Sequence, residues 1–568
     1  MLLTAGSCWL LPACSVIVDS NSDQCESSTD CAAFPGTSCQ DGVCLSGGAP
    51  CETNQQCIDD AGGQPAICRQ SDRRCATLLT ADCASVVPSP DVLSDDSTIL
   101  FAYMGPLVAP ADESEDDFSS LGIPIKQGVE LAFSEILTEK NGLPSPTAGA
   151  PPRPLALLAC HDLADPIGTA RHLTDTVQVP AIFGPAFSGV TADVAQQVAI
   201  PAGVMIMSAS ATSPSLTAIE DDGLLWRTVP SDSIQAVPLA NLVKYVEARI
   251  RARQELMSTD QVRLAITVKG DAYGKGLANA VTKLLVFNGK DATANSTNFL
   301  QVDFPDPSTG ASVDFPGIVA QVVEFAPDIV IPLGTNESVK SIVGGIEAAW
   351  PTTGSPPPLP SYVCPDGGRL DEMIALVDAD NSLRGRVVGS VPGHKTADFN
   401  AFALRFRAAF KNEDPGTYAE NAYDAGYLLS YAAVSLGTQP ITGRNLAKAM
   451  GKMVGGTSIE PGPDGISPAF QALRGGSAID YNGASGRLDF NLDTGEAVAD
   501  IDTWCIDLDN EGDADFVFAG QYYDATAQEF VDSVVNCCKL DNEPCESNSE
   551  CCSGICDTST TMECIGDG

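Results

Sequence analysis

Basic residues are scarce in this chain, and their scarcity excludes one class of partner. The 568 residues include 31 Lys and Arg against 74 Asp and Glu, which gives a formal net charge of −43 at pH 7. So large a negative charge repels the phosphate backbone of nucleic acids and anionic membrane surfaces. We therefore expect no nucleic acid among the partners of this protein.

Histidine is rarer still. The chain contains three histidines, His161, His172 and His394. None is spaced with another as in a metal site or a catalytic triad. We therefore predict that the protein is not an enzyme and uses no metal or other cofactor.

Long apolar runs are also missing. Residues 1–13 (MLLTAGSCWLLPA) are apolar but too few to span a bilayer, and no later run is apolar enough to do so. The tetrapeptide LPAC at residues 11–14 resembles a lipobox, the cleavage and lipidation site of bacterial lipoproteins. This resemblance implies a signal peptide over residues 1–14 and a diacylated Cys14. We expect an extracytoplasmic protein, in the periplasm or on the cell surface, that contacts the membrane only through a lipid anchor; a secreted protein without an anchor is the alternative.

Cysteine, in contrast, is plentiful, and the 21 cysteines gather near the two ends, which is typical of an oxidising compartment. A four-cysteine pattern near the N-terminus occurs twice with too few apolar residues to bury a core, so two disulfides per repeat must hold it. Zinc is the competing interpretation, but the repeats contain no CxxC pair and no histidine. We expect a tandem stalk or interaction module over residues 15–85 and a linker over 86–97. The repeats are Cys25-x5-Cys31-x7-Cys39-x4-Cys44 and Cys51-x5-Cys57-x10-Cys68-x6-Cys75.

Between the cysteine-rich ends, short apolar runs alternate with helical patterns. This alternation predicts doubly wound parallel α/β sheets, with enough strands for two of them. The predicted strands are Thr98–Tyr103, Leu155–Ala159, Ala181–Phe183, Val204–Met207, Val262–Lys269, Ile329–Leu333 and Tyr362–Cys364.

Two neighbouring strand ends carry hydroxyl groups. Ser188 follows the third predicted strand, and Ser208, Ser210 and Thr212 follow the fourth. Parallel sheets bind ligands at these carboxyl ends, where helix N-termini present N–H groups and a partial positive charge. Each hydroxyl alone could merely cap a helix. Together they favour a cleft that binds a carboxylate.

Six stretches of the central region occur together in one known family. They are GVELAFSEI (128–136), FGPAFSGVT (183–191), SASATSPSLT (208–217), WRTVPSDSIQ (226–235), DAYGKGLANAV (271–281) and AYDAGYLL (422–429). In this order, over about residues 99–535, they resemble the type I periplasmic binding proteins, especially the Leu/Ile/Val-binding group that supplies ABC transporters.

The resemblance implies an α/β fold of two Rossmann-like lobes with parallel sheets, joined by a three-stranded hinge and closing over an amino acid. The implied ranges within residues 98–536 are about 98–234 and 396–475 for the first lobe, and about 235–395 and 476–536 for the second. A β segment at residues 478–490 would complete the second lobe.

The resemblance also implies a ligand set. Ser188 and Thr212 match the family's hydroxyl ligands for the α-carboxylate, with the backbone of Ser210 and Ala211 beside them. Tyr273 matches an aromatic residue that covers the ligand.

Asp366 matches the acidic residue that receives the α-ammonium. A buried zwitterion needs hydrogen-bond donors at one end and a carboxylate at the other. Asp366 is one methylene shorter than the Glu common at this position, and the loop at residues 110–122 is longer and acidic here. The resemblance therefore does not fix branched-chain specificity, and a surface turn is the alternative reading of Asp366.

In the tail at residues 537–568, the six cysteines from Cys538 onward have a spacing, with an adjacent pair at residues 551–552, that resembles the inhibitor cystine knot. Six cysteines allow about fifteen pairings, and spacing alone selects none. In the knot family the first cysteine pairs with the fourth, the second with the fifth and the third with the sixth. This order would join Cys538 to Cys552, Cys545 to Cys556 and Cys551 to Cys564.

Five cysteines remain in the central region and at its ends. We expect Cys505 to pair with Cys537 and, as a second choice, Cys83 with Cys160. The fifth of these cysteines is Cys364. Because the number is odd, at least one of the five stays free or pairs with another chain.

We therefore predict a solute-binding protein that captures an amino acid or a related small polar metabolite and presents it to an ABC permease. Closure of the lobes would be the signal that the permease reads. The alternative is a surface sensor or interaction protein that uses the same fold without transport, with its disulfide modules binding a partner.

Overall fold

The computed structural model divides into two compact units, residues 1–77 and 78–568. Cys14 and the cysteine side chains of the first repeat lie outside the described residues. The structure describes residues 37–40, 43–46, 48–108, 118–309, 311–353, 355–393, 396–508, 512–532, 537–540, 542–545, 551–552, 556–558 and 562–565.

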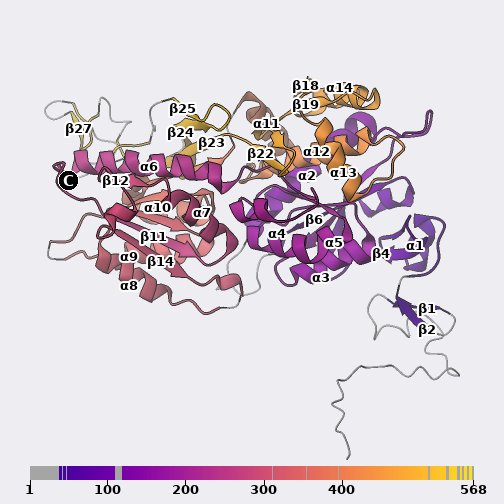
Figure 1. The fold of residues 1–568 in the computed structure, drawn as a ribbon, viewed down its shortest axis with the longest axis horizontal. Helices are drawn as coiled ribbons and strands as arrows, with labels where there is room; N and C mark the ends of the chain where they lie inside the picture. The colour runs from indigo at the N-terminus through magenta and orange to yellow at the C-terminus, as the bar shows by residue number, and fades with distance from the viewer. Residues whose placement is uncertain are drawn as a thin grey trace, which may run out of the picture. The chain divides into compact units, whose positions relative to one another are not determined.

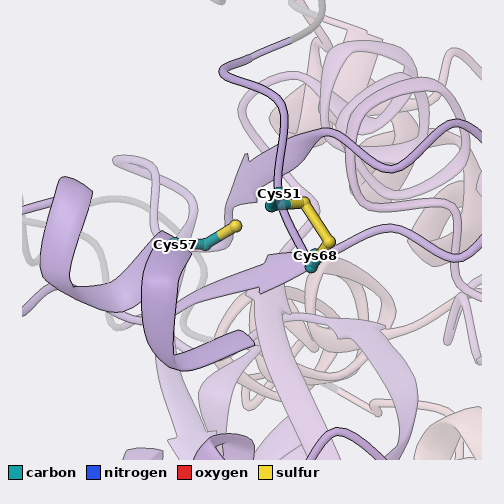
Figure 2. A group of neighbouring side chains, drawn as sticks. All are labelled: Cys51, Cys57 and Cys68. Atoms are coloured by element: carbon teal, nitrogen blue, oxygen red, sulfur yellow. A yellow bond between two sulfur atoms is a disulfide. The ribbon is translucent and has the colours of Figure 1, made fainter. Parts of the chain in front are cut away.

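The first unit is held by disulfides. A hairpin of β1 (Thr37–Gln40) and β2 (Val43–Ser46) precedes the second repeat, which comprises α1 (Asn54–Asp60), β3 (Ala66–Cys68) and β4 (Cys75–Thr77). Cys51 pairs with Cys68 and Cys57 with Cys75. Figure 2 shows the first of these bonds with Cys57 beside it. Although three of the sulfur atoms lie within 4.8 Å of one another, all four are in disulfides and none is a thiolate that could bind zinc.

The second unit contains two eight-stranded sheets, each the centre of one lobe (Figure 1). The first sheet consists, in spatial order, of β21 (Asp489–Asn491), β22 (Glu496–Val498), β10 (Leu225–Arg227), β9 (Met205–Ser208), β8 (Ala181–Phe183), β6 (Ile99–Gly105), β7 (Leu155–His161) and β5 (Cys83–Val87). The second consists of β14 (Phe299–Phe304), β11 (Leu264–Lys269), β15 (Ile329–Leu333), β16 (Ser361–Cys364), β17 (Val387–Pro392), β23 (Ile501–Leu508), β24 (Ala514–Asp524) and β25 (Glu529–Val531).

Helices cover both faces of these sheets, which explains why strands such as β6 and β11 are buried along their whole length. In the second lobe, α6 and α7 pack on one face and α8, α9 and α10 on the other. The first-lobe helices are α2 (Ser119–Lys140), α3 (Pro166–Arg171), α4 (Ser188–Val194), α5 (Ile200–Ala202), α11 (Ala397–Ala409), α12 (Ala419–Ser435), α13 (Gly443–Ala449) and α14 (Pro463–Arg474). The second-lobe helices are α6 (Asp232–Arg253), α7 (Ala272–Thr282), α8 (Phe315–Phe325), α9 (Gly344–Ala349) and α10 (Asp371–Ala379). Within the described residues, no helix combines the length and apolar character that crossing a bilayer requires.

The parallel strands of both lobes follow the same order. In chain order within each lobe this is 2-1-3-4-5, because β7-β6-β8-β9-β10 in the first sheet corresponds to β14-β11-β15-β16-β17 in the second. The chain passes between the lobes after β10, β17 and β22. The predicted two-lobed α/β fold is therefore confirmed. Such sheets bind ligands where the strand order reverses, beside the loops that follow β6, β8, β11 and β15.

The last segment of the second lobe begins later in the chain than predicted, after β22 instead of at residue 476. Strands β21 and β22 extend the first sheet, where β22 pairs in parallel with β10. The small sheet of β18 (Thr457–Ile459), β19 (Ile479–Gly483) and β20 (Gly486–Arg487) also belongs to the first lobe, because Asp424 on α12 accepts hydrogen bonds from Tyr481, Ala484 and Ser485. The segment 476–498 therefore completes the first lobe, and the prediction for it was wrong.

The expected linker is part of the first lobe as well. Strand β5 pairs antiparallel with β7 at the sheet edge, and the Cys83–Cys160 disulfide joins the two strands. Val86 and Leu93 are buried. A solvated linker would not bury apolar side chains in this way. The cysteine-rich unit consequently ends at residue 77.

The tail packs against the second lobe. Its disulfides join Cys538 to Cys552, Cys545 to Cys556 and Cys551 to Cys564, and Cys505 is bonded to Cys537. Arg249 on α6 forms a bidentate ion pair with Glu543, with N–O distances of 2.7 and 2.6 Å. This ion pair therefore anchors the tail to the second lobe. Cys364 is the free cysteine among the described residues.

Asp162, directly after β7, is a buried acid without a partner. It is 0% exposed, and neither carboxylate oxygen accepts a hydrogen bond from another described residue. Burial raises the pKa of Asp162 from 3.8 to about 7. The folded state keeps this proton to a higher pH than the unfolded chain does. Asp162 therefore lowers stability progressively as the pH rises from about 4 to about 7.

Replacement of Asp162 with Asn should remove this pH dependence. We expect the variant to be more stable than the native protein by about 2–4 kcal/mol at pH 8, and equally stable at pH 4. Urea denaturation at several pH values measures the difference. The exposed Asp193 on α4 provides the control, since Asp193→Asn should change stability little at any pH. A native protein that is equally stable at pH 4 and pH 8 would contradict the prediction.

Candidate functional site

A cavity lies between the lobes at the point where the strand order reverses. It contains about 660 Å³ of space not occupied by protein atoms, part of it open to solvent. First-lobe loops and second-lobe loops contribute to it about equally. The lining residues are Phe118, Ser120, Leu121, Ala186, Phe187, Ser188, Ser210, Thr212, Asp271, Tyr273, Thr335, Asn336, Asp366, Gly367, Arg369, Leu370, Thr417 and Tyr418.

Ser188 and Thr212, the two residues predicted to bind the α-carboxylate, lie on the side of the cavity that the first lobe forms. The Ser188 hydroxyl oxygen accepts a hydrogen bond from the backbone N–H of Ser213 at 3.1 Å, which leaves its own proton free to donate. The buried hydroxyl of Thr212 has no hydrogen-bond partner among the described residues. Buried hydroxyls are normally paired. Both groups can therefore donate to a ligand.

Of the two neighbouring residues whose backbone was predicted to contact the ligand, the structure places Ser210 on the cavity wall and Ala211 away from it. Ser210 lines the cavity, but its hydroxyl donates to the carbonyl of Ala186 at 2.9 Å. Ala211 does not line the cavity. Its N–H donates to the hydroxyl of Ser208 at 3.1 Å, because Ser208 ends β9 with its side chain turned back toward the loop. The expectation of Ala211 as a ligand residue is therefore not met.

Asp366 faces the cavity from the second lobe, so the surface-turn reading does not apply to it. It follows β16 in a short 3-10 turn (Asp366–Gly368) and is 5% exposed. One carboxylate oxygen accepts from the Tyr273 hydroxyl at 2.7 Å, and the other accepts from Tyr418. Tyr273 also accepts from the N–H of Gly367 at 3.1 Å. Burial, and then the charge of Asp366, raise the pKa of both tyrosines well above its usual value, so both remain donors.

A second buried acid lies close to this cluster. Asp232, at the first turn of α6, is 0% exposed, and neither of its carboxylate oxygens has a hydrogen-bond partner among the described residues. Burial, and then the charge of Asp366, raise the pKa of Asp232 well above its usual value. The Thr212 hydroxyl is close enough to oppose this shift but is not aligned for a hydrogen bond. A positive ligand group bound near both acids would favour the charged form of Asp232.

Apolar and aromatic side chains form the rest of the cavity wall. The Phe118 and Phe187 rings meet edge to face with centroids 5.0 Å apart. Leu121 and Leu370 add aliphatic surface. The cavity therefore combines two ends of opposite polarity with an apolar side, the arrangement common in sites for small amphiphilic molecules.

Hydrogen bonds at and beside the cavity join the two lobes. Tyr418 at the start of α12 bonds Asp366 of the second lobe, and Ser213 of the first lobe donates to the carbonyl of Ala272 at 2.8 Å. Neither Tyr418 nor Asp232 was predicted from the sequence. No local pattern marks Tyr418. The PSD tripeptide at residues 230–232 reads as an ordinary helix start, with Ser231 as its cap.

Comparisons with known proteins agree with this architecture. No family model matches the chain. The chain is 27% identical over 315 residues to the chemotactic signal transduction system substrate-binding protein BasB of Halobacterium salinarum. The match covers 54% of this chain and 65% of that protein, so it spans about two thirds of the relative's length.

Two solved structures share the fold over most of this chain. One is the substrate-binding protein LivJ of a branched-chain amino acid transporter from Streptococcus pneumoniae, in complex with isoleucine. Its TM-score is 0.53 and its identity 19%, over 74% of this chain and 99% of that one. The other is the leucine-binding protein LivK from Thermotoga maritima, with a TM-score of 0.52 and 16% identity over 74% and 97%. The chain has the type I periplasmic binding protein fold.

A third structure with the periplasmic binding protein fold holds a different kind of ligand. It is a solute-binding protein of an ABC transporter from Rhodopseudomonas palustris, in complex with 3,4-dihydroxybenzoic acid. Its TM-score is 0.51 and its identity 15%, over 76% of this chain and 98% of that one. The periplasmic binding protein fold therefore does not identify the ligand by itself.

Proposed function

We propose that this protein is an extracytoplasmic solute-binding protein that captures an amino acid between its lobes and presents it to an ABC permease. The observation that carries this proposal is the placement of Ser188 and Thr212 on one wall of the cavity and Asp366 on the other. Hydroxyl donors suit the α-carboxylate of an amino acid, and a buried carboxylate suits its α-ammonium. The likeness to binding proteins that hold isoleucine and leucine supports the same assignment.

Closure would couple ligand binding to the signal read by the permease. Asp366 belongs to the second lobe, and its partner Tyr418 belongs to the first. A ligand held at both walls would add further bonds between the lobes and so favour the closed state. We place a lipid anchor at Cys14, which would keep the protein at the membrane surface on the permease side.

Titration calorimetry of the purified protein with the common amino acids tests the assignment, and Thr212→Val tests the hydroxyl wall. The Thr212 hydroxyl has no protein partner, so the isosteric variant loses no hydrogen bond of the unliganded protein. We expect about tenfold to hundredfold weaker amino-acid binding, because one hydrogen bond to a charged group is lost. The melting temperature without ligand should stay the same. Unchanged affinity would exclude Thr212 from the site.

One observation favours a second function. The 27% identity to a chemotactic substrate-binding protein suggests a sensor that uses the same cavity without transport. Uptake of the identified ligand by cells that lack this protein separates the two functions. Loss of uptake supports transport, and normal uptake with a lost response to the ligand supports the sensor.

A further inference from the structure

Arg369 brings a positive charge to the wall of the ligand cavity. It follows the turn of Asp366 directly and lines the cavity together with Thr417 and Tyr418 of the first lobe. No expectation from the sequence concerns this residue. Because the proposed amino-acid contacts at Ser188, Thr212 and Asp366 leave it unused, its role in the cavity needs an explanation.

The guanidinium has hydrogen-bond donors to spare. Arginine carries five N–H donors. Nη1 donates to the Thr417 hydroxyl at 3.0 Å, and the group lies over the Phe516 ring at 4.9 Å. Within the part of the chain that the structure describes, no carboxylate oxygen lies within 4.0 Å of Arg369. Arg369 is partly buried and lines both the ligand cavity and a neighbouring one that contains Asp502 and Phe516, so its remaining donors are available to a ligand.

The surroundings keep Arg369 charged without using those donors. Burial lowers its pKa from 12.5, and the carboxylates of Glu420, Asp515 and Asp502, in decreasing order, oppose the shift. These acids act from beyond ion-pair distance. The cavity therefore presents a cation that is electrostatically supported but not paired.

We propose that Arg369 selects ligands whose side chain ends in a carboxylate, so that the preferred solute is an acidic amino acid. This inference rests on the proposed function, since it assumes the α-carboxylate at Ser188 and Thr212 and the α-ammonium at Asp366. The side-chain carboxylate then binds the free guanidinium N–H groups as a third point. Phe118 and Leu121 contact the methylene groups.

Other ligand classes fit this arrangement less well. An aliphatic amino acid would leave the guanidinium N–H groups that face the ligand without an acceptor, and sites with such polar groups reject analogues that lack the matching group. A dicarboxylate without an amine would place no positive charge beside Asp366 and Asp232. An acidic amino acid satisfies both the acids and the arginine.

A ligand panel on the native full chain is the first test. Titration calorimetry would compare L-glutamate, L-aspartate, L-leucine, L-glutamine and succinate. We expect L-glutamate or L-aspartate to bind at least tenfold more tightly than each of the other three. If leucine or glutamine binds most tightly, the inference about Arg369 fails while the proposed function stands. If no amino acid binds, both fail.

The variant Arg369→Met tests the assignment to this residue. We expect it to weaken binding of the acidic amino acid at least thirtyfold and to change leucine affinity less than threefold, with Arg369→Lys intermediate. Arg407→Met is the control, because Arg407 lies outside the ligand cavity and pairs with the exposed Asp414. An equal loss of affinity for glutamate and leucine would show a structural role and overturn the proposal. If Arg369→Met does not fold, the ligand panel on the native protein still decides.

Discussion

Replacement of Asp366 with Asn should abolish most amino-acid binding while the protein remains folded. The native carboxylate accepts hydrogen bonds from Tyr273 and Tyr418 and lies beside a second buried acid, Asp232. Asn keeps the shape but removes the negative charge that an α-ammonium requires. Loss of one member of a buried charge pair costs about 2–5 kcal/mol of binding free energy. This corresponds to roughly 30-fold to several thousandfold weaker binding.

Asp371→Asn is the matched control for this experiment. Asp371 is an exposed acid in the first turn of α10, five residues further along the chain. It does not line the cavity, and its loss should change ligand affinity less than twofold. Calorimetry with the best amino-acid ligand measures both variants. Native affinity in Asp366→Asn would refute the proposed role of Asp366 and, with it, the zwitterion site.

Replacement of Glu135 with Ala should strongly destabilise the first lobe. Glu135 on α2 is 8% exposed and accepts hydrogen bonds from the hydroxyls of Tyr423 and Tyr427 on α12, each at 2.6 Å. Its other oxygen accepts from Arg405 Nε on α11 at 2.9 Å. Its removal leaves a partly buried arginine and two buried hydroxyls without their acceptor. We expect a loss of about 3–5 kcal/mol in the free energy of unfolding.

Glu139→Ala provides the comparison, since Glu139 is exposed one turn further along the same helix. Urea denaturation should separate the two variants clearly, with Glu139→Ala close to the native protein. Glu135→Gln keeps one acceptor oxygen and should fall between them. A Glu135→Ala protein as stable as the Glu139→Ala protein would show that α2 and α12 are held by apolar packing alone.

Much of the fold could be predicted because it depends on local patterns. The buried strands at Ala181–Phe183 and Ile329–Leu333 are continuous apolar runs ended by turn residues, and these signals lie within a few residues of one another. Which strand pairs with which could not be predicted from such local patterns. Nothing in the short strand β22 indicates that its partner is β10, more than 250 residues earlier, so the segment was assigned to the wrong lobe.

The residues of the candidate site also divide into those that local patterns predict and those that they do not. Ser188, Thr212 and Asp366 follow predicted strands, and the common edge of a parallel sheet brings such residues together. Arg369 reaches the cavity from the end of a 3-10 turn and Tyr418 from a helix start, whereas Asp232 lies near Asp366 where the chain crosses between the lobes. Their positions depend on how the two lobes meet. That geometry is set by contacts between distant segments and leaves no periodic trace in the sequence.

The late position of β22 and β23 in the chain governs the timing of folding during synthesis. The edge of β10 stays unpaired until β22, at residue 496, has been synthesised. The edge of β17 likewise stays unpaired until β23, which begins at residue 501, has been synthesised. Two exposed strand edges thus persist while most of the polypeptide emerges, and such edges promote misassociation. We therefore expect neither lobe to reach its native state on a nascent chain shorter than about 500 residues, and protection of these edges by chaperones becomes important over that interval.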